Sequence, residues 1–453
     1  MLNKLPPSKR IFTDSDISAK LIKDLAPITS ESMSLSAKTL ESCDEQFTYL
    51  TECQSKMPVA LLSESQAKQI TLGAGMLYDA MVQSLKFLFN EYIGLVPYFY
   101  GKEFIRGNPD FVEYAIDTYK KSNPAIYGRF DIAYDFERSK FNGVLEFNGD
   151  TPVMLFESVY LPKNATAESM CGLLARPYDN YLDNLQKMLA ESCMGKRCAV
   201  LCDLVYIEDS LTTETLYKAF SDAGCDVVFA DIGQLEYNAG DSPTFTVYGA
   251  EVERIFILSP WEEMVLNGPE VFADWKKWNG RVQFFEPAWR WFISNKGSLA
   301  WLHFFIRECE NPLAASEMRQ FYSRFKEYIS LIPFTSMSKI DFDGRAHVSK
   351  PIYGRLSNNI TFYDESGNVT DSTGGHYDDS PLVYQDKVTL CSIENEAYTM
   401  VNVWMTPSQG QGLFMKSGCI ALRECDTAIT SIRNERFLNH GVVSDKQLKK
   451  LWS

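Results

Sequence analysis

The sequence predicts a mixed α/β (α+β) protein, in which a parallel strand–helix–strand unit is inserted between helical and antiparallel regions. Three observations predict this class. Apolar residues recur at helical spacing before residue 105, short continuous apolar runs flank a helix between 197 and 263, and strands alternate with Gly/Asn/Asp turns beyond about 345. At 453 residues the chain can bury two or three cores. It has no long Gly/Ser linker, so we expect its subdomains to be closely packed.

The first predicted region, residues 1–105, is helical. Ser63 and Gln66 have the spacing of a capping box, and the residues that follow place Leu77, Leu85 and Leu88 on one helical face. The most apolar stretch, 76–101, is interrupted by charged and amide side chains. It therefore predicts a core helix and not a membrane span.

The second predicted region, residues 196–265, is a parallel βαβ unit. CAVLCDL, CDVVFADI and RIFIL are short apolar runs of the kind that form strands buried on both faces. A helix is expected to begin near Asp209-Ser210 and to end at Gly224, which suits a left-handed cap. A helical crossover between consecutive strands is typical of parallel pairing.

Charge and cysteine usage exclude several classes of protein. The formal net charge of −15 argues against a nucleic-acid-binding surface, and it either attracts a cationic substrate such as a polyamine or serves solubility alone. The eleven cysteines contain no CxxC pair, and Cys193 and Cys198 have no second Cys/His pair to complete a zinc site. With no signal-peptide pattern at the N-terminus, we expect a cytoplasmic protein with free thiols and no membrane association.

The segment from Arg129 to Asp150 predicts a β-hairpin with a polar turn at Asn142-Gly143. Period-2 alternation would bring Arg129, Asp131, Glu146 and Asn148 to one face of this hairpin. Two carboxylates and an amide oxygen are ligands that Mg²⁺ prefers, and an arginine beside them could neutralise a phosphoryl group. The alternative is an ordinary amphipathic hairpin with a solvated charged face.

Two lysine segments suggest contacts to phosphate. Lys296 follows Ser294-Asn295 at the expected start of a helix, where free backbone N–H groups favour anions. Lys350 ends a strand and precedes Gly354 and Arg355, and a hairpin from 358 to 370 could fold over a triphosphate. Neither segment is a Walker A loop, and a lysine taken singly is more often a surface residue.

Other polar residues lie in apolar surroundings. Tyr384 and Gln385 end a strand that could contact an adenine edge, and Glu262 follows a buried strand where an ammonium group could bind. Arg423 could hold a substrate carboxylate or form a salt bridge with Glu424 or Asp426. With four histidines and no GxSxG motif, the sequence gives little support to a hydrolase.

Together these segments resemble the synthetase domain of glutathionylspermidine synthase and its relatives, in the ATP-grasp superfamily. The similarity runs from about residue 30 to 445, and its most specific motifs are GRFD, LEFNGDTP, the WE of SPWEE, FEPAW…SNK, KPIYGR…NI, VYQ and ALRECDTAIT. The resemblance implies an ATP-grasp fold and the cofactors ATP and Mg²⁺. It also implies that Asp131, Glu146 and Asn148 are magnesium ligands, and that Arg129 steadies the acyl phosphate and the tetrahedral species that follows it.

The remaining implied roles concern the nucleotide. Lys296 and Lys350 match the lysines that grip the ATP phosphates, and Arg355 matches an arginine of the loop that covers the site. Tyr384 and Gln385 fall at the strand that holds the nucleotide.

The substrate positions are only partly kept. Thr151, Glu262 and Arg423 match positions around the thiol peptide and the polyamine, but Val153 replaces a small polar residue near the thiol-peptide site. Relatives often have a glycine within the loop after Arg355, where this chain reads Leu-Ser-Asn. Bifunctional relatives also carry a Cys/His amidase, which we do not expect here because the first 105 residues contain no histidine.

The expected organisation is a helical region (1–105), a magnesium-hairpin part of the ATP-grasp core (106–195), a βαβ substrate subdomain (196–265) and ATP-binding lobes (266–453). The expected activity is ATP- and Mg²⁺-dependent, ADP-forming ligation of a carboxylate donor, such as a small thiol peptide, to a polyamine or another amine. An acyl phosphate would be the intermediate. The alternatives are a different acid and amine, or a non-catalytic protein that uses the fold for interaction or assembly.

Overall fold

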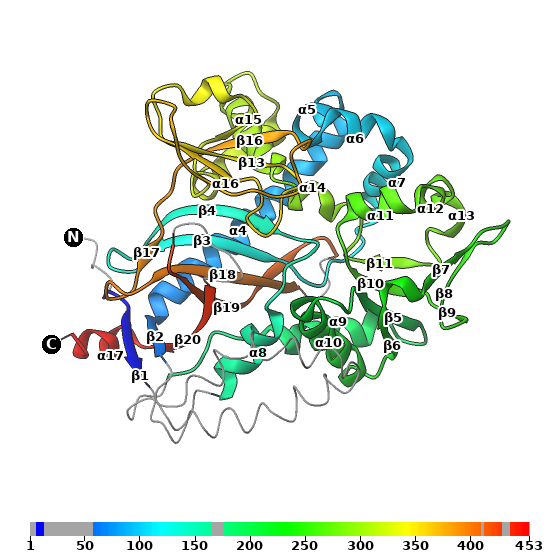
Figure 1. The fold of residues 1–453 in the computed structure, drawn as a ribbon, viewed down its shortest axis with the longest axis horizontal. Coiled ribbons are helices and arrows are strands. Elements are labelled where there is room, and N and C mark those ends of the chain that lie inside the picture. The colour runs from blue at the N-terminus through cyan, green and yellow to red at the C-terminus, as the bar shows by residue number, and fades with distance from the viewer. Residues whose placement is uncertain (1–5, 13–57, 165–174, 409–411, 428–434, 453) are drawn as a thin grey trace.

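The computed structural model describes residues 6–12, 58–164, 175–408, 412–427 and 435–452. Four β-sheets and the helices around them form a mixed α/β architecture, so the predicted fold class is confirmed. In Figure 1 the sheet with β13 and β16 lies above β3 and β4 of the largest sheet, while the sheet with β5, β6 and β10 lies at the lower right. Strands of the first two of these sheets carry polar side chains that the sequence predicts to form the site.

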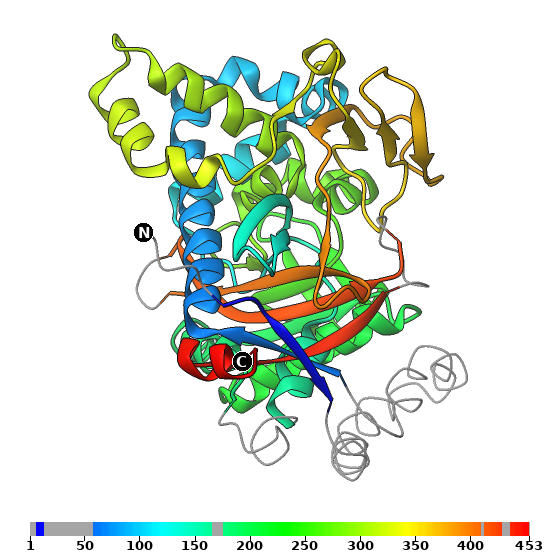
Figure 2. The ribbon, with the colours of Figure 1, turned by 90° about the vertical axis from the view of Figure 1, so that its left-hand side faces the viewer.

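The largest sheet joins strands from both ends of the chain. Its order is β1 (Lys9–Phe12), β2 (Pro58–Ser63), β20 (Glu435–Val443), β19 (Met415–Cys425), β18 (Tyr398–Pro407), β3 (Arg129–Asp135) and β4 (Lys140–Asn148), with β17 (Cys391–Ser392) beside β18. Only β2 and β20 pair in parallel among these neighbours. Helix α4 (Glu64–Asn90) packs against β19, and Figure 2 shows it standing upright beside this sheet.

Two segments of the predicted helical region are strands instead. The run PVALLS forms β2, in which five of six residues are buried, and β1 pairs with it in antiparallel fashion. A continuous apolar run suits a strand buried on both faces, and its partner β20 lies more than 370 residues further along the chain. The predicted capping box is confirmed: Gln66 N donates to Ser63 Oγ, and Ser63 N donates to Gln66 Oε1.

The inserted sheet is parallel throughout, as predicted. Its order is β11 (Gln283–Phe285), β10 (Arg254–Leu258), β5 (Arg197–Cys202) and β6 (Asp226–Asp231), so it extends beyond residue 265. Helix α10 (Ile207–Asp222) connects β5 to β6, packs beside α9 (Tyr181–Ser192), and is followed by Gly224 at φ 80°, the left-handed position predicted for it. A small antiparallel sheet of β7 (Leu235–Asn238), β8 (Thr244–Val247) and β9 (Ala250–Glu251) is attached.

The C-terminal region contains the predicted antiparallel sheet. Its order is β12 (Thr335–Ser336), β16 (Leu382–Asp386), β13 (His347–Pro351), β14 (Thr361–Tyr363) and β15 (Val369–Ser372). The last two strands form the predicted hairpin after residue 358. Helices α14 (Arg290–Ser294), α15 (Gly297–Glu310) and α16 (Ser316–Ile329) precede this sheet along the chain.

The remaining helices connect and cover these sheets. They are η1 (Ile93–Leu95), α5 (Val96–Tyr100), α6 (Lys102–Gly107), α7 (Pro109–Lys120), α8 (Leu155–Asn164), η2 (Ile232–Gln234), α11 (Trp261–Asn267), α12 (Pro269–Ala273), α13 (Trp275–Trp278), η3 (Lys339–Phe342) and α17 (Asp445–Lys450). Buried aromatic rings such as Phe111, Trp261 and Trp291 pack edge to face or tilted between them. This aromatic core holds α11 and α14, which carry site residues.

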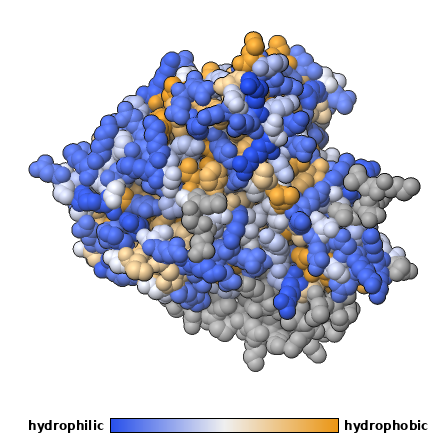
Figure 3. Space-filling view, turned by 180° about the vertical axis from the view of Figure 1, so that it is seen from behind, coloured by the Kyte–Doolittle hydropathy of each residue, from blue (hydrophilic) through white to orange (hydrophobic). Residues whose placement is uncertain are grey.

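The polarity of the surface and of the helices agrees with the charged and polar residues of the sequence. The face shown in Figure 3 is mostly hydrophilic, with smaller hydrophobic patches between the polar side chains. In the part of the chain that the structure describes, every helix is too short or too polar to cross a bilayer.

The predicted position of the hairpin turn is wrong. β3 and β4 are joined at residues 136–139, where Asp135 Oδ1 accepts the backbone N–H groups of Glu137 and Arg138 at 3.1 and 2.7 Å. Asn142 and Gly143 lie inside β4. A Cβ atom on Gly143 would lie 2.6 Å from Pro333 Cγ, so this glycine permits a close approach and does not form a turn.

Candidate active site

The hairpin brings its polar residues to one face, as the alternation predicts. Arg129 lies opposite Asn148, and Asp131 lies opposite Glu146. The register shifts after Asp131, so that Leu145 forms a bulge. The shift places Val144 opposite Ile132 and keeps the four polar side chains aligned at the open end of the hairpin.

Asp131 is a buried carboxylate surrounded by donors from three strands. Arg129 donates through Nε and Nη2 at 2.7 and 3.0 Å, and Arg423 on β19 donates through Nη2 at 2.8 Å. Asn402 on β18 donates to the same carboxylate at 2.7 Å and accepts from Arg423 Nε at 2.8 Å. Both guanidinium groups are therefore held in place by this one carboxylate.

Arg423 thus contacts the hairpin, whereas the other two predicted substrate residues, Thr151 and Glu262, contact Arg355. Of the salt bridges that the sequence left open, Glu424 pairs with Arg10 and Arg436, and Asp426 pairs with Arg436. The Arg423 guanidinium pairs with Asp131 instead.

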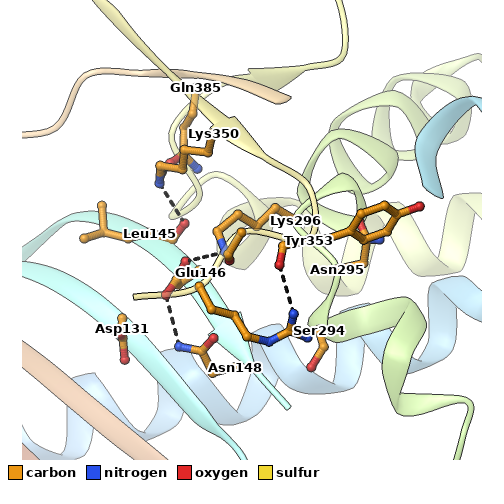
Figure 4. A network of polar contacts seen from close by, with 12 residues as sticks. Asp131, Leu145, Glu146, Asn148, Ser294, Asn295, Lys296, Lys350, Tyr353 and Gln385 are labelled. Atoms are coloured by element: carbon orange, nitrogen blue, oxygen red, sulfur yellow. Dashed lines mark hydrogen bonds and ion pairs between the residues drawn. The ribbon is translucent and has the colours of Figure 1, made fainter. Parts of the chain in front are cut away.

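Glu146 pairs with Lys296, and Lys350 lies close to this pair. Lys296 Nζ lies 3.1 Å from Glu146 Oε2, and Asn148 Nδ2 lies 3.0 Å from Glu146 Oε1. Figure 4 shows the Lys296 and Asn148 side chains turned toward Glu146. Lys350 Nζ donates to Gln385 Oε1 at 2.8 Å and to the Leu145 carbonyl at 3.5 Å. The hairpin, the start of α15 and the strands β13 and β16 therefore meet at one point.

The charges of this cluster perturb one another. Burial alone would raise the pKa of Glu146, but Lys296 and Lys350 lower it to about 2, so the carboxyl is ionised at neutral pH. Burial lowers the pKa of Lys350 to about 8, although Glu146 opposes this shift, and the nearby Lys296 lowers it further. Lys296 therefore pairs with Glu146 directly, whereas Lys350 acts on it only through its charge.

Hydrogen bonds from both its backbone and its side chain hold Lys296 in place. It is the N-terminal cap of α15, as predicted, and its N–H donates to the Ile352 carbonyl at 3.1 Å. Its Nζ also donates to the Gly354 carbonyl. The next residue, Gly297, would place a Cβ atom 1.8 Å from the Phe99 carbonyl oxygen, so only glycine fits there.

A second cluster surrounds Arg355. Its Nη2 donates to Asp150 Oδ2 at 2.7 Å, its Nε to Thr151 Oγ1 at 3.0 Å, and its Nη1 to Glu262 Oε1. Glu262 lies in the first turn of α11, and its other oxygen accepts from Trp291 Nε1 at 3.0 Å. One arginine is therefore shared by two buried carboxylates, Asp150 and Glu262.

A small cavity of about 10 Å³ joins the two clusters, which is about the space that one water molecule needs. Asn148, Lys296, Glu262 and Arg355 are among its walls. Among these walls, the Arg355 side chain is held by Asp150 and Glu262. A cavity of this size has no room for a ligand much larger than water.

The loop that carries Arg355 has an unusual backbone. Leu356, Ser357 and Asn359 have φ values of 52°, 55° and 56°, in the left-handed region that glycine adopts without strain. The glycine that relatives often have in this loop suits such a conformation. The sequence difference noted above therefore falls on a strained segment.

Tyr384 is the predicted site residue that lies apart from both clusters. It pairs with Ser349, whereas Gln385 pairs with Val348, so the two side chains lie on opposite faces of the sheet. The Tyr384 ring lies near His347 and Phe342. The other predicted residues belong to the Asp131, Glu146 or Arg355 clusters.

Sequence reasoning missed several residues. Asp150 has the same alternation as Glu146 and Asn148, a signal from which it could have been included. Asn402 and Trp291 carry no local motif, and their contacts to Asp131 and Glu262 span 271 and 29 residues of sequence.

The fold and the site define a class of protein: a mixed α/β protein in which lysine and arginine side chains from several elements meet buried carboxylates. The chain belongs to the glutathionylspermidine synthase pre-ATP-grasp family, whose sequence profile matches residues 103–442. The resemblance predicted from the motifs is therefore confirmed.

Individual relatives are distant. The chain is 24% identical over 336 residues to a protein of Haemophilus influenzae provisionally named acid–amine ligase, covering 71% of this chain and 76% of that protein. It is 22% identical over 359 residues to trypanothione synthetase of Crithidia fasciculata, covering 70% of this chain and about half (48%) of that enzyme. A crystal structure from Methylobacillus flagellatus, provisionally named γ-glutamylcysteine synthetase, aligns with a TM-score of 0.43 at 10% identity over 76% of this chain and 87% of its own.

Proposed function

We propose that this protein is an ATP- and Mg²⁺-dependent, ADP-forming ligase that joins a carboxylate to an amine through an acyl phosphate. Its family membership and its similarity to proteins named as an acid–amine ligase and a trypanothione synthetase support amide-forming ligation. The observation that carries the proposal is the Lys296–Glu146 ion pair with the charge of Lys350 close to it, because two lysines near one carboxylate leave positive charge for a phosphate chain.

The hairpin carries oxygen donors of the kind that bind a hard divalent cation. Glu146, Asn148 and Asp131 offer carboxylate and amide oxygens, the donor set that Mg²⁺ prefers. Glu146 is ionised and only partly buried, so it can exchange Lys296 for a cation. When bound, Mg²⁺ would neutralise charge on the transferring phosphoryl group.

The residues of the chain would divide the work between two half-reactions. Lys296 and Lys350 would orient the ATP phosphates, with Gln385 fixing the Lys350 ammonium. The acid substrate would take the γ-phosphoryl group and release ADP. Arg129, held by Asp131 at the mouth of the hairpin, would then stabilise the oxyanion as the amine displaces phosphate.

The amine would bind at the Arg355 cluster. Asp150 and Glu262 carry two negative charges against one guanidinium, so a cationic group such as a polyamine ammonium can replace Arg355 there. The released Arg355 and Thr151 are then available to a substrate carboxylate. We propose a small thiol peptide or a similar acid as its source.

The test measures phosphate release from ATP and Mg²⁺ by the full chain, with a panel of thiol peptides and polyamines added singly and in pairs. We expect release that needs both an acid and an amine, with a product whose mass equals their sum less one water molecule. Chelation of Mg²⁺ should abolish it. If the protein neither turns over ATP nor binds it, the proposal fails and the interaction or assembly role gains support.

A further inference from the structure

Three cysteines from different parts of the chain meet at the amino-terminal edge of the parallel sheet. Cys193 caps the C-terminal end of α9, Cys198 is the second residue of β5, and Cys225 directly precedes β6. Their sulfur atoms all lie within 4.8 Å of one another. Glu262 follows the carboxyl end of β10, so this cluster lies at the opposite edge from the proposed ligase site.

Strand register places two of the thiols on one face. Cys198 pairs with Val227 on β6, and Cys225 lies two residues before Val227, so the two cysteines share that face. Helices α9 and α10 pack beside this region, and Cys193 reaches it from the end of α9. The sequence spacing alone hides this arrangement, because Cys225 is 27 residues from Cys198.

The spacing of the sulfur atoms suits a thiophilic metal ion. A zinc ion bonds cysteine sulfur at about 2.3 Å, which puts tetrahedral ligands roughly 3.8 Å apart. Movements of less than about 1 Å would therefore close the cluster around one ion. Cys193 and Cys198 are buried, and the half-exposed Cys225 gives an entry path from solvent.

A neighbouring arginine supplies an independent observation. Arg254 on β10 pairs directly with Cys198, so its side chain leaves the sheet on the same face. Among the described residues its buried Nε has no hydrogen-bond partner. Three thiolates around a divalent ion carry a net charge of about −1. A guanidinium beside them would offset this charge, and its Nε–H could donate to a thiolate sulfur.

We propose that Cys193, Cys198 and Cys225 form a binding site for a soft divalent metal ion of the Zn²⁺ class, with the fourth position left to water. Binding releases the thiol protons to solvent as the three metal–sulfur bonds form. The site is separate from the Mg²⁺ ligands proposed above, which are oxygen atoms on the hairpin. It does not depend on the ligase proposal.

The test titrates the reduced full-length protein with Co²⁺ and Zn²⁺. We expect a thiolate-to-cobalt charge-transfer absorption that saturates at one ion per chain and disappears when Zn²⁺ is added. Cys225→Ser should weaken Co²⁺ binding at least tenfold, whereas the matched control Cys202→Ser, on the same strand as Cys198, should leave it unchanged. Equal binding by wild type and Cys225→Ser, or no charge-transfer band, would overturn the proposal.

A second measurement needs no variant. Alkylation of the wild-type protein, read by mass spectrometry, should be slowed at least tenfold at Cys225 by equimolar Zn²⁺. Cys391, also half-exposed but on β17, serves as the internal reference and should react at the same rate with and without the ion. Loss of reactivity at both cysteines, or at neither, would contradict a site at the cluster.

Discussion

The Glu146 cluster and the Arg355 cluster are close to mirror images in charge. In the first, Lys296 pairs with one carboxylate on which the charge of Lys350 also acts, and in the second, two carboxylates share one arginine. Side chains of both clusters line the same small cavity. The charges in neither cluster balance: the first has a surplus of positive charge, and the second has a surplus of negative charge.

This difference indicates which ligand each side can accept. A surplus of buried positive charge favours a phosphate chain, and a surplus of buried negative charge favours an ammonium group. In the proposed reaction, Arg355 would occupy the place of the amine until the amine binds. The two clusters can be tested separately, because a change on one side should leave the ligand of the other side largely unaffected.

The largest effect is expected from Lys296→Met, which removes one of the two cations that would face the phosphates. We expect kcat/KM for ATP to fall by about 10²- to 10³-fold, the cost of removing one preorganised donor. Steady-state phosphate release measures it. The matched control is Lys102→Met on exposed α6, which should keep wild-type kinetics. Equal losses in both variants would contradict a phosphate role for Lys296.

Glu262→Gln tests the Arg355 cluster, where the amine is proposed to bind. It keeps an oxygen for Trp291 but removes one charge, so KM for the amine should rise by about 10- to 100-fold, as for loss of a charged hydrogen bond. KM for ATP should stay within about twofold, measured on the same preparation. Glu270→Gln, on exposed α12, is the control. A variant in which ATP binding is lost and amine binding is kept would reverse the assignment of the two sides.

The smallest effect concerns pH. The pKa of Lys350 is about 8, so its ammonium is present below that pH and is lost as pH rises through it. We expect the affinity for ATP to be level below pH 8 and to decrease above it, by at most about tenfold per pH unit. Lys350→Arg, which stays charged, should show no such decrease in a binding titration from pH 7 to 9. An unchanged slope in that variant would exclude Lys350 as the titrating group.

Much of the fold followed from local patterns. The parallel unit from 197 to 258 was predicted because each of its strands is a short apolar run and its helix ends at a glycine in the left-handed conformation. The strands β1 and β2 were missed because their place depends on pairing with β20 at the other end of the chain. Local patterns cannot predict such a distant partner.

The hairpin turn shows a second limit of prediction from local sequence. An Asn-Gly pair is a strong turn signal, but Gly143 is needed for contact with Pro333, nearly 200 residues later. The candidate site residues were proposed from motifs resembling a family, and alternation alone supported only the hairpin set. Neither motif resemblance nor alternation predicted Asn402, because a single amide on β18 contacts Asp131 only when β18 pairs with β3.

The parallel pairing of β2 with β20 has a consequence for folding order. The four strands of the inserted sheet all lie between residues 197 and 285, whereas β2 at residue 58 has to wait for a partner that begins at 435. Because contacts distant in sequence form late, we expect β5, β6 and β10 to be protected early during refolding and β2 late. Pulse-labelled hydrogen exchange would show the opposite order if the large sheet nucleates first. On a ribosome, the hairpin would then emerge well before the strands β18 and β19, whose side chains fix Asp131 in place.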